Sequence, residues 1–151
     1  MADSGRIEGI GYKKEKRGRI FTLSEAFVGL QTGVATDVRG LPGKRQVTVL
    51  SLEDFDEACQ SLGVELPWTT RRANLLVSGL RFAETKGNHL KIGDVLLEIT
   101  GETDPCFRMD EQQEGLQEAL RPHWRGGVTC RVLSEGQIAV GDEIIMIKTT
   151  G

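Results

Sequence analysis

One cysteine has the surroundings of a residue that could do chemistry. Cys106 lies in the segment Thr-Asp-Pro-Cys-Phe-Arg at 103–108, between a predicted strand and a predicted helix. Pro105 fixes its own φ and stiffens the turn, and the unpaired N–H groups of a following helix would place positive charge near the sulfur. Arg108 and Arg125 add cations. These conditions favour thiolate, so we predict a reactive or metal-ligating Cys106, with a buried structural thiol as the alternative.

Basic residues at other positions could bind an anion. Arg71 and Arg72 stand on a short turn or helix predicted for residues 69–74, where one of them is expected to face a site, unless both are solvated. Arg45 lies at the mouth of a predicted strand, and Arg125 precedes two glycines that would let backbone approach a ligand. Guanidinium groups match phosphate geometry. The cationic run at residues 13–19 is interpreted as a solvated segment, with an anion contact as the alternative.

Composition and missing motifs disfavour several classes of function. The net charge is −3 and the pI about 5.5, so neither nucleic acid nor a membrane surface is an expected partner. No apolar run reaches the ~18 residues of a membrane span, and residues 1–10 lack the apolar stretch of a secretory signal, so we expect none. Three widely spaced cysteines without a Cys-x-x-Cys pair favour a reducing compartment, and we predict a cytoplasmic protein.

Glycine content and short apolar runs indicate a mainly β fold. The 151 residues contain 19 glycines, about 13% against a usual ~7%, and only 5% aromatic residues. Such a chain is expected to form short strands joined by many turns. Residues 6–22 are predicted to form a hairpin, and residues 23–43 a long loop with at most one short strand. Further strands are predicted at residues 46–50, 75–77, 80–82 and 128–133.

Two matched segments favour a closed barrel. Residues 90–100 and 138–147 share an apolar-x-apolar-Gly-Asp pattern, with Gly93 and Gly141 at the same place. The pattern predicts a tight turn that leads into a strand buried at consecutive positions. Several such strands in one small domain favour a barrel over an open sheet with exposed edges.

Two helices are predicted to accompany the strands. Ser51 is expected to cap a helix that ends before Gly63. Residues 109–120 have the spacing of a second helix. Cys59 lies on the apolar face of the first helix and Cys130 lies inside a strand, so both are predicted to be buried and inert.

Six short motifs follow one another along most of the chain. They are Gly-Val-Ala-Thr-Asp-Val-Arg-Gly at 33–40, Arg-Gln-Val-Thr-Val-Leu at 45–50, Arg-Arg-Ala-Asn-Leu-Leu-Val at 71–77, Leu-Lys-Ile-Gly-Asp at 90–94, Asp-Pro-Cys at 104–106 and Arg-Gly-Gly-Val at 125–128. In order and spacing they resemble the MOSC domain, the C-terminal domain of molybdenum-cofactor sulfurases, in its short stand-alone bacterial form. The resemblance implies a small β-barrel with two or three short helices over residues 23–151. Residues 1–22 would be an N-terminal strand or loop segment of the same domain.

The resemblance also implies roles for individual residues. Cys106 would carry sulfur as a persulfide or ligate molybdenum. The family's Arg-x-Asn motif falls on Arg72 and Asn74, which would lie near the pterin or phosphate of the molybdenum cofactor. Arg45 or Arg125 would help to hold the anionic part of that cofactor.

The family pattern is not matched everywhere. Where the family often has Gly-Asp-x-His-Gly, this chain has Thr-Asp-Val-Arg-Gly at 36–40, so no role of that histidine carries over. Asp37 is kept as a candidate site residue. Family-level descriptions include molybdenum-ion and pyridoxal-phosphate binding. The second fits the separate aminotransferase-like domain of the sulfurases, so we expect no pyridoxal phosphate in this chain.

Three functions stay open on these grounds. The first is a sulfur carrier or transfer protein, in which Cys106 accepts sulfane sulfur from a cysteine desulfurase and passes it to the molybdenum cofactor, a molybdoenzyme or another acceptor. The second is a molybdenum-dependent oxidoreductase that reduces N-hydroxylated compounds, although the extra N-terminal β domain of larger relatives with that activity is not expected here. The third is a non-enzymatic β-barrel that binds an anionic ligand.

Overall fold

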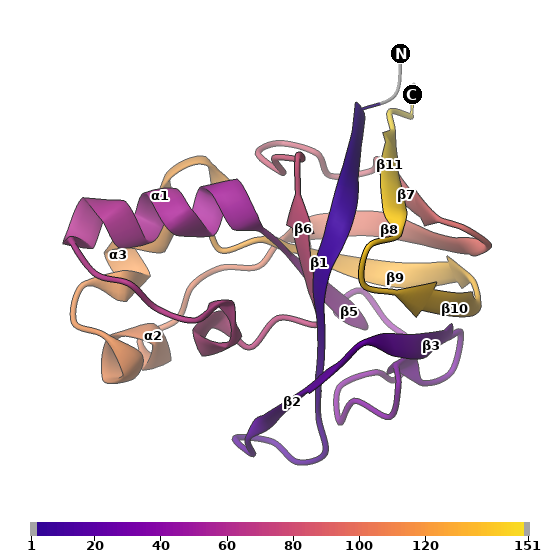
Figure 1. Cartoon of the computed structure of the whole chain (residues 1–151), viewed down its shortest axis with the longest axis horizontal. Helices are drawn as coiled ribbons and strands as arrows, with labels where there is room; N and C mark the ends of the chain where they lie inside the picture. The colour runs from indigo at the N-terminus through magenta and orange to yellow at the C-terminus, as the bar shows by residue number, and fades with distance from the viewer. Residues whose placement is uncertain (1–2, 150–151) are drawn as a thin grey trace.

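A computed structural model describes residues 3–149 as short strands, α-helices and single-turn 3-10 helices (Figure 1). The strands are β1 (Asp3–Lys13), β2 (Ile20–Leu23), β3 (Glu25–Gly29), β4 (Gly33–Val34), β5 (Val47–Ser51), β6 (Leu75–Ser78), β7 (His89–Ile92), β8 (Val95–Glu102), β9 (Val128–Ser134), β10 (Gly136–Ala139) and β11 (Glu143–Ile147). The helices are α1 (Leu52–Leu62), η1 (Trp68–Arg71), α2 (Arg108–Gln112), α3 (Leu116–Leu120) and η2 (Pro122–Trp124). Within residues 3–149, no helix has both the length and the apolar character needed to cross a membrane.

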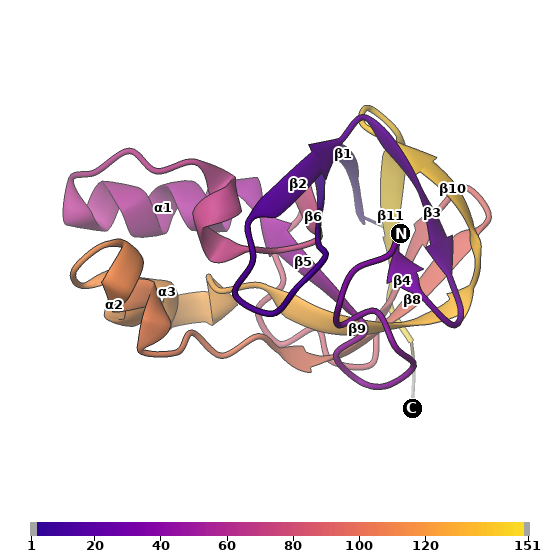
Figure 2. The same cartoon turned by 90° about the horizontal axis from the view of Figure 1, so that it is seen from below.

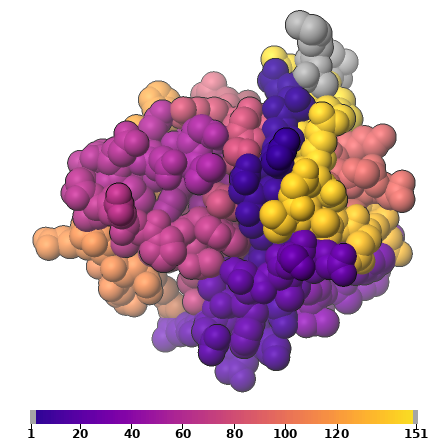
Figure 3. Space-filling view, in the orientation of Figure 1, coloured from indigo at the N-terminus to yellow at the C-terminus, as the bar shows by residue number. Residues whose placement is uncertain are grey.

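Seven of the strands in residues 3–149 close into a barrel. Their order is β11-β7-β8-β9-β5-β6-β1, and β1 pairs antiparallel with β11 to complete the ring. Figure 3 shows this closure as the indigo strand β1 beside the yellow strand β11. β2 extends β1 as the predicted hairpin, while β10, β3 and β4 form a separate small sheet. The mainly β barrel with short helices is therefore confirmed.

The two Gly-Asp turns make different connections. Gly93 (φ +59°) joins β7 to β8 as an antiparallel hairpin, whereas Gly141 (φ +98°) leads from β10 in the small sheet to β11 in the barrel. Both backbone conformations favour glycine. The prediction of strands buried at consecutive positions is wrong, because β8 and β11 alternate between buried and more exposed residues. Each antiparallel strand faces the core on one side only.

The fold has two hydrophobic cores. Buried aliphatic residues from every barrel strand fill the barrel. A second core, including Leu50, Phe55 and Leu120, lies between the helices and β5–β6. Figures 1 and 2 show α1, α2 and α3 together on one side of the barrel. This helical side carries the loop that contains Cys106.

The first helix begins and ends where the sequence predicted. The Ser51 side chain accepts a hydrogen bond from the Asp54 N–H at 3.3 Å, which satisfies one of the open donors at the start of α1. Gly63 ends the helix in a left-handed conformation with φ +68°. The helix packs Phe55 into the second core.

Three predicted elements differ from the structure. Residues 23–43 contain two short strands, β3 and β4, and not at most one. Residues 80–82 lie outside any strand, although Leu80 and Phe82 are buried in the barrel core. The helix predicted for residues 109–120 is split into α2 and α3, because the backbone is extended at Gln113 and left-handed at Gly115, with φ +85°. Since α2 has only five residues, a long helix dipole does not form behind Cys106.

Candidate functional site

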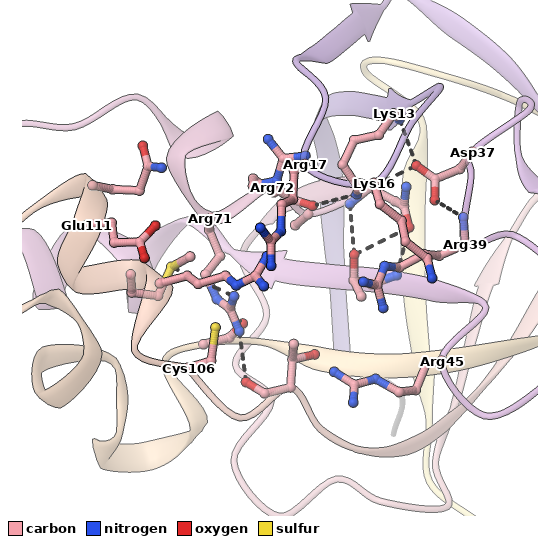
Figure 4. Close-up of a pocket in the computed structure, with 18 of the residues that line it drawn as sticks. Lys13, Lys16, Arg17, Asp37, Arg39, Arg45, Arg71, Arg72, Cys106 and Glu111 are labelled. Atoms are coloured by element: carbon pink, nitrogen blue, oxygen red, sulfur yellow. Dashed lines mark hydrogen bonds and ion pairs between the residues drawn. The ribbon is translucent and has the colours of Figure 1, made fainter.

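A pocket of about 460 Å³ opens beside Cys106, where segments distant in the sequence meet (Figure 4). Its walls come from the end of β1 and the β1–β2 turn, from the loop before β5, from η1 and the residues after it, and from the start of α2. The pairing of β1 with β6, continued by the hydrogen bond from the Gly11 N–H to the Asn74 carbonyl, brings the end of β1 next to the residues after η1.

Basic side chains dominate the pocket. Among the described residues, eight basic and two acidic side chains line it, although the whole chain carries a net charge of −3. The basic residues are Lys13, Lys16, Arg17, Arg39, Arg45, Arg71, Arg72 and Arg108. All except Lys13 and Arg71 lack both an ion pair and a side-chain hydrogen bond within residues 3–149. Unpaired cations in one concave site favour anionic ligands.

Cys106 supplies an exposed thiol at this pocket. It follows the buried Pro105 in the loop between β8 and α2, and its carbonyl accepts the Met109 N–H at 2.9 Å. In Figure 4 the Cys106 sulfur points toward the Arg71 guanidinium. The predicted combination of an accessible sulfur with nearby cations is therefore present.

The other two cysteines are buried, as predicted. Cys59 lies in the helical core and Cys130 in the barrel core. Burial raises the pKa of both thiols, which favours their uncharged form. Of the three thiols, all within the described residues, Cys106 is therefore the one that a reactant can reach from solvent.

Arg71 is a buried anchor below the pocket. Its Nε donates to the Gly126 carbonyl at 3.0 Å, and its Nη2 donates to the Thr103 carbonyl at 2.9 Å. Burial lowers the pKa of Arg71, the Cys106 sulfur opposes this shift, and Arg45 adds to it. An arginine remains protonated even so. Arg71 thus ties η1 to the loop that carries Cys106 and keeps a fixed cation beside the sulfur.

The Arg72 guanidinium points into the pocket, in a different direction from the Arg71 side chain (Figure 4). A left-handed backbone at Arg72, with φ +62°, ends η1 and separates the two neighbouring side chains. Burial lowers the pKa of Arg72, Asp37 opposes this shift, and Arg39 adds to it. The Nη2 of Arg72 is buried and has no hydrogen-bond partner within residues 3–149. A buried donor without a partner indicates a missing acceptor.

Asp37 organises the opposite end of the pocket. Its carboxylate accepts the backbone N–H of Lys13 at 2.8 Å and that of Arg39 at 3.0 Å. The Lys13 ammonium lies 3.6 Å from the same carboxylate and donates to the Arg72 carbonyl at 3.2 Å. Burial lowers the pKa of Lys13 despite this pair. Asp37 therefore holds the loop before β5 against β1.

Asn74 lies in the pocket wall, but its side-chain amide is hydrogen-bonded to the backbone of two strands. Its Oδ1 accepts the Thr48 N–H at 3.0 Å, and its Nδ2 donates to the Gly11 carbonyl at 3.0 Å. Its backbone N–H donates to the Thr48 hydroxyl at 3.0 Å. The amide therefore links β1 to β5, directly before β6 begins.

We expect Asn74→Ala to lower the free energy of unfolding by about 2–4 kcal/mol, since the Thr48 N–H and the Gly11 carbonyl would lose their partners inside the protein. Urea unfolding measures this loss as a lower midpoint. Asn88→Ala, at a half-buried position, is the matched control and should cost less than about 1 kcal/mol. An unchanged midpoint with weaker anion binding would instead make Asn74 a ligand-binding group.

Arg45 and Arg125, both predicted to bind the anion, are placed differently. Arg45 is exposed and lines the pocket. Arg125 does not line it: its Nη1 donates to the Ala119 carbonyl at 3.2 Å, and its Nη2 lies 3.6 Å from Glu57. Gly127, the second of the two glycines that follow Arg125, is required for packing, because a Cβ there would clash with the Val49 carbonyl oxygen.

Several pocket residues were not predicted as site residues. Lys13, Lys16 and Arg17 were interpreted as part of a solvated segment, but all three line the pocket and Lys13 is buried. Arg39 stands where the family often has histidine, and it also faces the pocket. The sequence shows the cluster of positive charge at residues 13–19, but its position beside the pocket is set by the β1–β2 hairpin.

The donor atoms around Cys106 limit what metal chemistry the chain could support alone. Within residues 3–149, His, Cys, Asp and Glu side chains form no group of three that could hold a metal ion. Cys106 offers one thiolate ligand to a metal that arrives with ligands of its own.

Comparison with known proteins places this fold and site in a family. The model of the MOSC domain matches residues 31–145, so the chain belongs to the MOSC domain family. This family is associated with the molybdenum cofactor. Among curated proteins, none matches the sequence significantly.

Solved structures share the fold over nearly the whole chain. The YuaD protein from Bacillus subtilis is 22% identical with a TM-score of 0.85, and the match covers 99% of both chains. YiiM from Escherichia coli is 13% identical with a TM-score of 0.71, over 97% of this chain and 71% of that one. YiiM from Geobacillus stearothermophilus is 20% identical with a TM-score of 0.67, over 95% and 73%. At these identities the likeness concerns the fold.

Proposed function

We propose that this protein is a sulfur carrier linked to the molybdenum cofactor, with sulfane sulfur held as a persulfide on Cys106. The observation that supports this most directly is the exposed Cys106 thiol beside the fixed Arg71 cation, in a pocket of unpaired basic side chains. A persulfide is an anion at neutral pH, and cations of this kind stabilise negative charge on sulfur. The buried Cys59 and Cys130 offer no comparable site.

The transfer is a pair of sulfur displacements. The Cys106 thiolate attacks the outer sulfur of a persulfide on a cysteine desulfurase, a new S–S bond forms, and the desulfurase thiolate leaves with the electron pair of the broken bond. A nucleophilic acceptor then attacks the outer sulfur, and the Cys106 thiolate leaves. No oxidant or reductant is consumed. Arg71 would stabilise Cys106 as attacking group in the first step and as leaving group in the second.

The pocket residues also fit the molybdenum cofactor as a ligand. The unpartnered Nη2 of Arg72 and the nearby Arg39 would bind its phosphate, with Arg45 in support. Cys106 would supply a thiolate ligand. When bound, the group would supply two-electron redox chemistry, which is the basis of the alternative function, reduction of N-hydroxylated compounds. Molybdenum and pterin in protein from a molybdate-fed host would favour this alternative, and their absence would count against it.

Loading with sulfur tests the carrier function directly. The reduced protein is incubated with a cysteine desulfurase and cysteine, desalted, and assayed for cyanide-labile sulfur. We expect about one sulfane atom per chain, and mass spectrometry should locate it on the peptide that contains Cys106. A protein that acquires no sulfane sulfur but binds anions would instead be the non-enzymatic barrel.

A further inference from the structure

The unpaired cations define the charge of the molecule that reacts with Cys106. Lys16, Arg17, Arg39, Arg45, Arg72 and Arg108 line the pocket without an ion pair within residues 3–149. They repel one another, as the effect of Arg39 on Arg72 illustrates. The unpartnered Arg72 Nη2 adds a donor for an acceptor oxygen. A neutral reactant would leave this repulsion in place, whereas a reactant with two negative charges relieves it.

We propose that small sulfur dianions are direct substrates of Cys106, thiosulfate as a sulfur donor and sulfite as a sulfur acceptor. The inference rests on the proposed function, because it requires that Cys106 carry a persulfide. It goes beyond that function because loading then needs no protein partner.

Both reactions balance without a further reagent. The Cys106 thiolate attacks the outer sulfur of thiosulfate, the S–S bond of thiosulfate breaks, and sulfite leaves with the electron pair. The products are the Cys106 persulfide anion and sulfite dianion, so the total charge is unchanged. In the reverse direction, sulfite attacks the outer sulfur of the persulfide, thiosulfate forms, and the Cys106 thiolate leaves.

The main obstacle to this reaction is the repulsion between the Cys106 thiolate and a dianion, and the basic residues of the pocket offset that repulsion. A thiolate and a dianion in contact repel each other even in bulk water, and more strongly in a partly desolvated pocket. Arg71 is fixed beside the sulfur by its two hydrogen bonds to backbone carbonyls, so it does not need to reorient during the reaction. The exposed Arg39 and Arg45 attract the incoming dianion. Neutral donors and acceptors gain nothing from these cations.

The geometry also suits a small reactant. Cys106 is exposed at the pocket, so thiosulfate can reach the sulfur without displacing any buried side chain. The oxygens of the departing sulfite can accept hydrogen bonds from guanidinium groups. Inorganic phosphate has similar charge and size but no reactive sulfur, so it should compete with thiosulfate.

The experiment compares charge-reversal variants with dianionic and neutral reactants. Wild type, Arg45→Glu and Arg39→Glu are loaded with thiosulfate and assayed for cyanide-labile sulfur. Desulfurase-loaded samples are then discharged with sulfite or with an uncharged phosphine, tris(hydroxypropyl)phosphine, which takes the outer sulfur as phosphine sulfide while the Cys106 thiolate leaves. Lys91→Glu makes the same charge change at an exposed position on β7, outside the pocket. We expect each pocket variant to slow both dianion reactions about tenfold, and Lys91→Glu to change them less than twofold. Discharge to the uncharged phosphine should change less than twofold in all variants.

The outcomes separate this inference from the carrier function. Wild-type rates with sulfite should fall steeply as salt is raised from 20 to 300 mM, because the attraction is screened. If a desulfurase loads Cys106 but thiosulfate does not, or if the pocket variants keep the wild-type rate with sulfite, the inference is overturned and the carrier function stands. If neither donor loads Cys106, both are overturned.

Discussion

Cys106→Ser is expected to remove all cyanide-labile sulfur from protein loaded by a cysteine desulfurase. Serine keeps the size of the side chain, and the exposed position tolerates it, so the fold should be unaffected. The hydroxyl cannot hold a sulfane atom. Cyanolysis, which releases the sulfane sulfur as thiocyanate, measures the loss directly, and the expected fall is from about one sulfur per chain to background.

Cys59→Ala and Cys130→Ala are the controls for this loss. Both thiols are buried among apolar residues, and burial raises their pKa, so neither should contribute sulfane sulfur. Each variant should retain the full wild-type loading. Full loading of Cys106→Ser, or loss of loading in a control that is still folded, would show that the sulfur is carried elsewhere.

The parts of the fold predicted correctly depend on local signals. Ser51 and Gly63 mark the ends of α1 because capping and left-handed backbone are properties of single residues. Gly93 and Gly141 were placed correctly in turns for the same reason. Which strands those turns join is a non-local property. The same sequence pattern therefore occurs in a hairpin, β7–β8, and in a connection between two sheets, β10–β11.

The incorrect elements are those that tertiary packing decides. The apolar spacing of residues 109–120 fits one helix, but an extended Gln113 and a left-handed Gly115 interrupt it, and α3 packs against α1. Leu80 and Phe82 have the composition of a strand and are buried as expected, yet no neighbouring strand pairs with them. A residue can be buried without belonging to a paired strand, and a pattern of apolar residues predicts only the burial.

The candidate site shows the same division. Cys106 was identified from its local sequence and from resemblance, and it lies at the pocket. Arg125, only 19 residues further along the chain, was expected beside it but is held by Glu57 and the Ala119 carbonyl. Lys13 and Arg17 come from the other end of the chain. They reach the pocket because β1 pairs with β6, whose preceding residues carry Arg72.

Arg71→Met is expected to lower the free energy of unfolding by about 3 kcal/mol and to slow sulfur loading at least tenfold. Methionine fills much of the same volume but leaves the Gly126 and Thr103 carbonyls without their buried donors, each at a cost of about 1–3 kcal/mol. The loop that carries Cys106 then loses its tie to η1, and the sulfur loses its fixed cation. Urea unfolding and the rate of desulfurase-dependent loading measure the two effects.

The adjacent arginine provides the matched control. Arg72→Met removes the same charge one residue further along, but the Arg72 side chain makes no hydrogen bond or ion pair within residues 3–149, and the attraction of Asp37 for it is opposed by the repulsion from Arg39. Its loss should change the free energy of unfolding by less than about 1 kcal/mol, while binding of phosphate or thiosulfate weakens. If Arg72→Met proves the more destabilising of the two, the structural role assigned to Arg71 and the ligand-binding role assigned to Arg72 are both wrong. If the two variants behave as expected, the two neighbouring arginines have different roles: Arg71 stabilises the structure of the pocket, and Arg72 binds the anionic ligand.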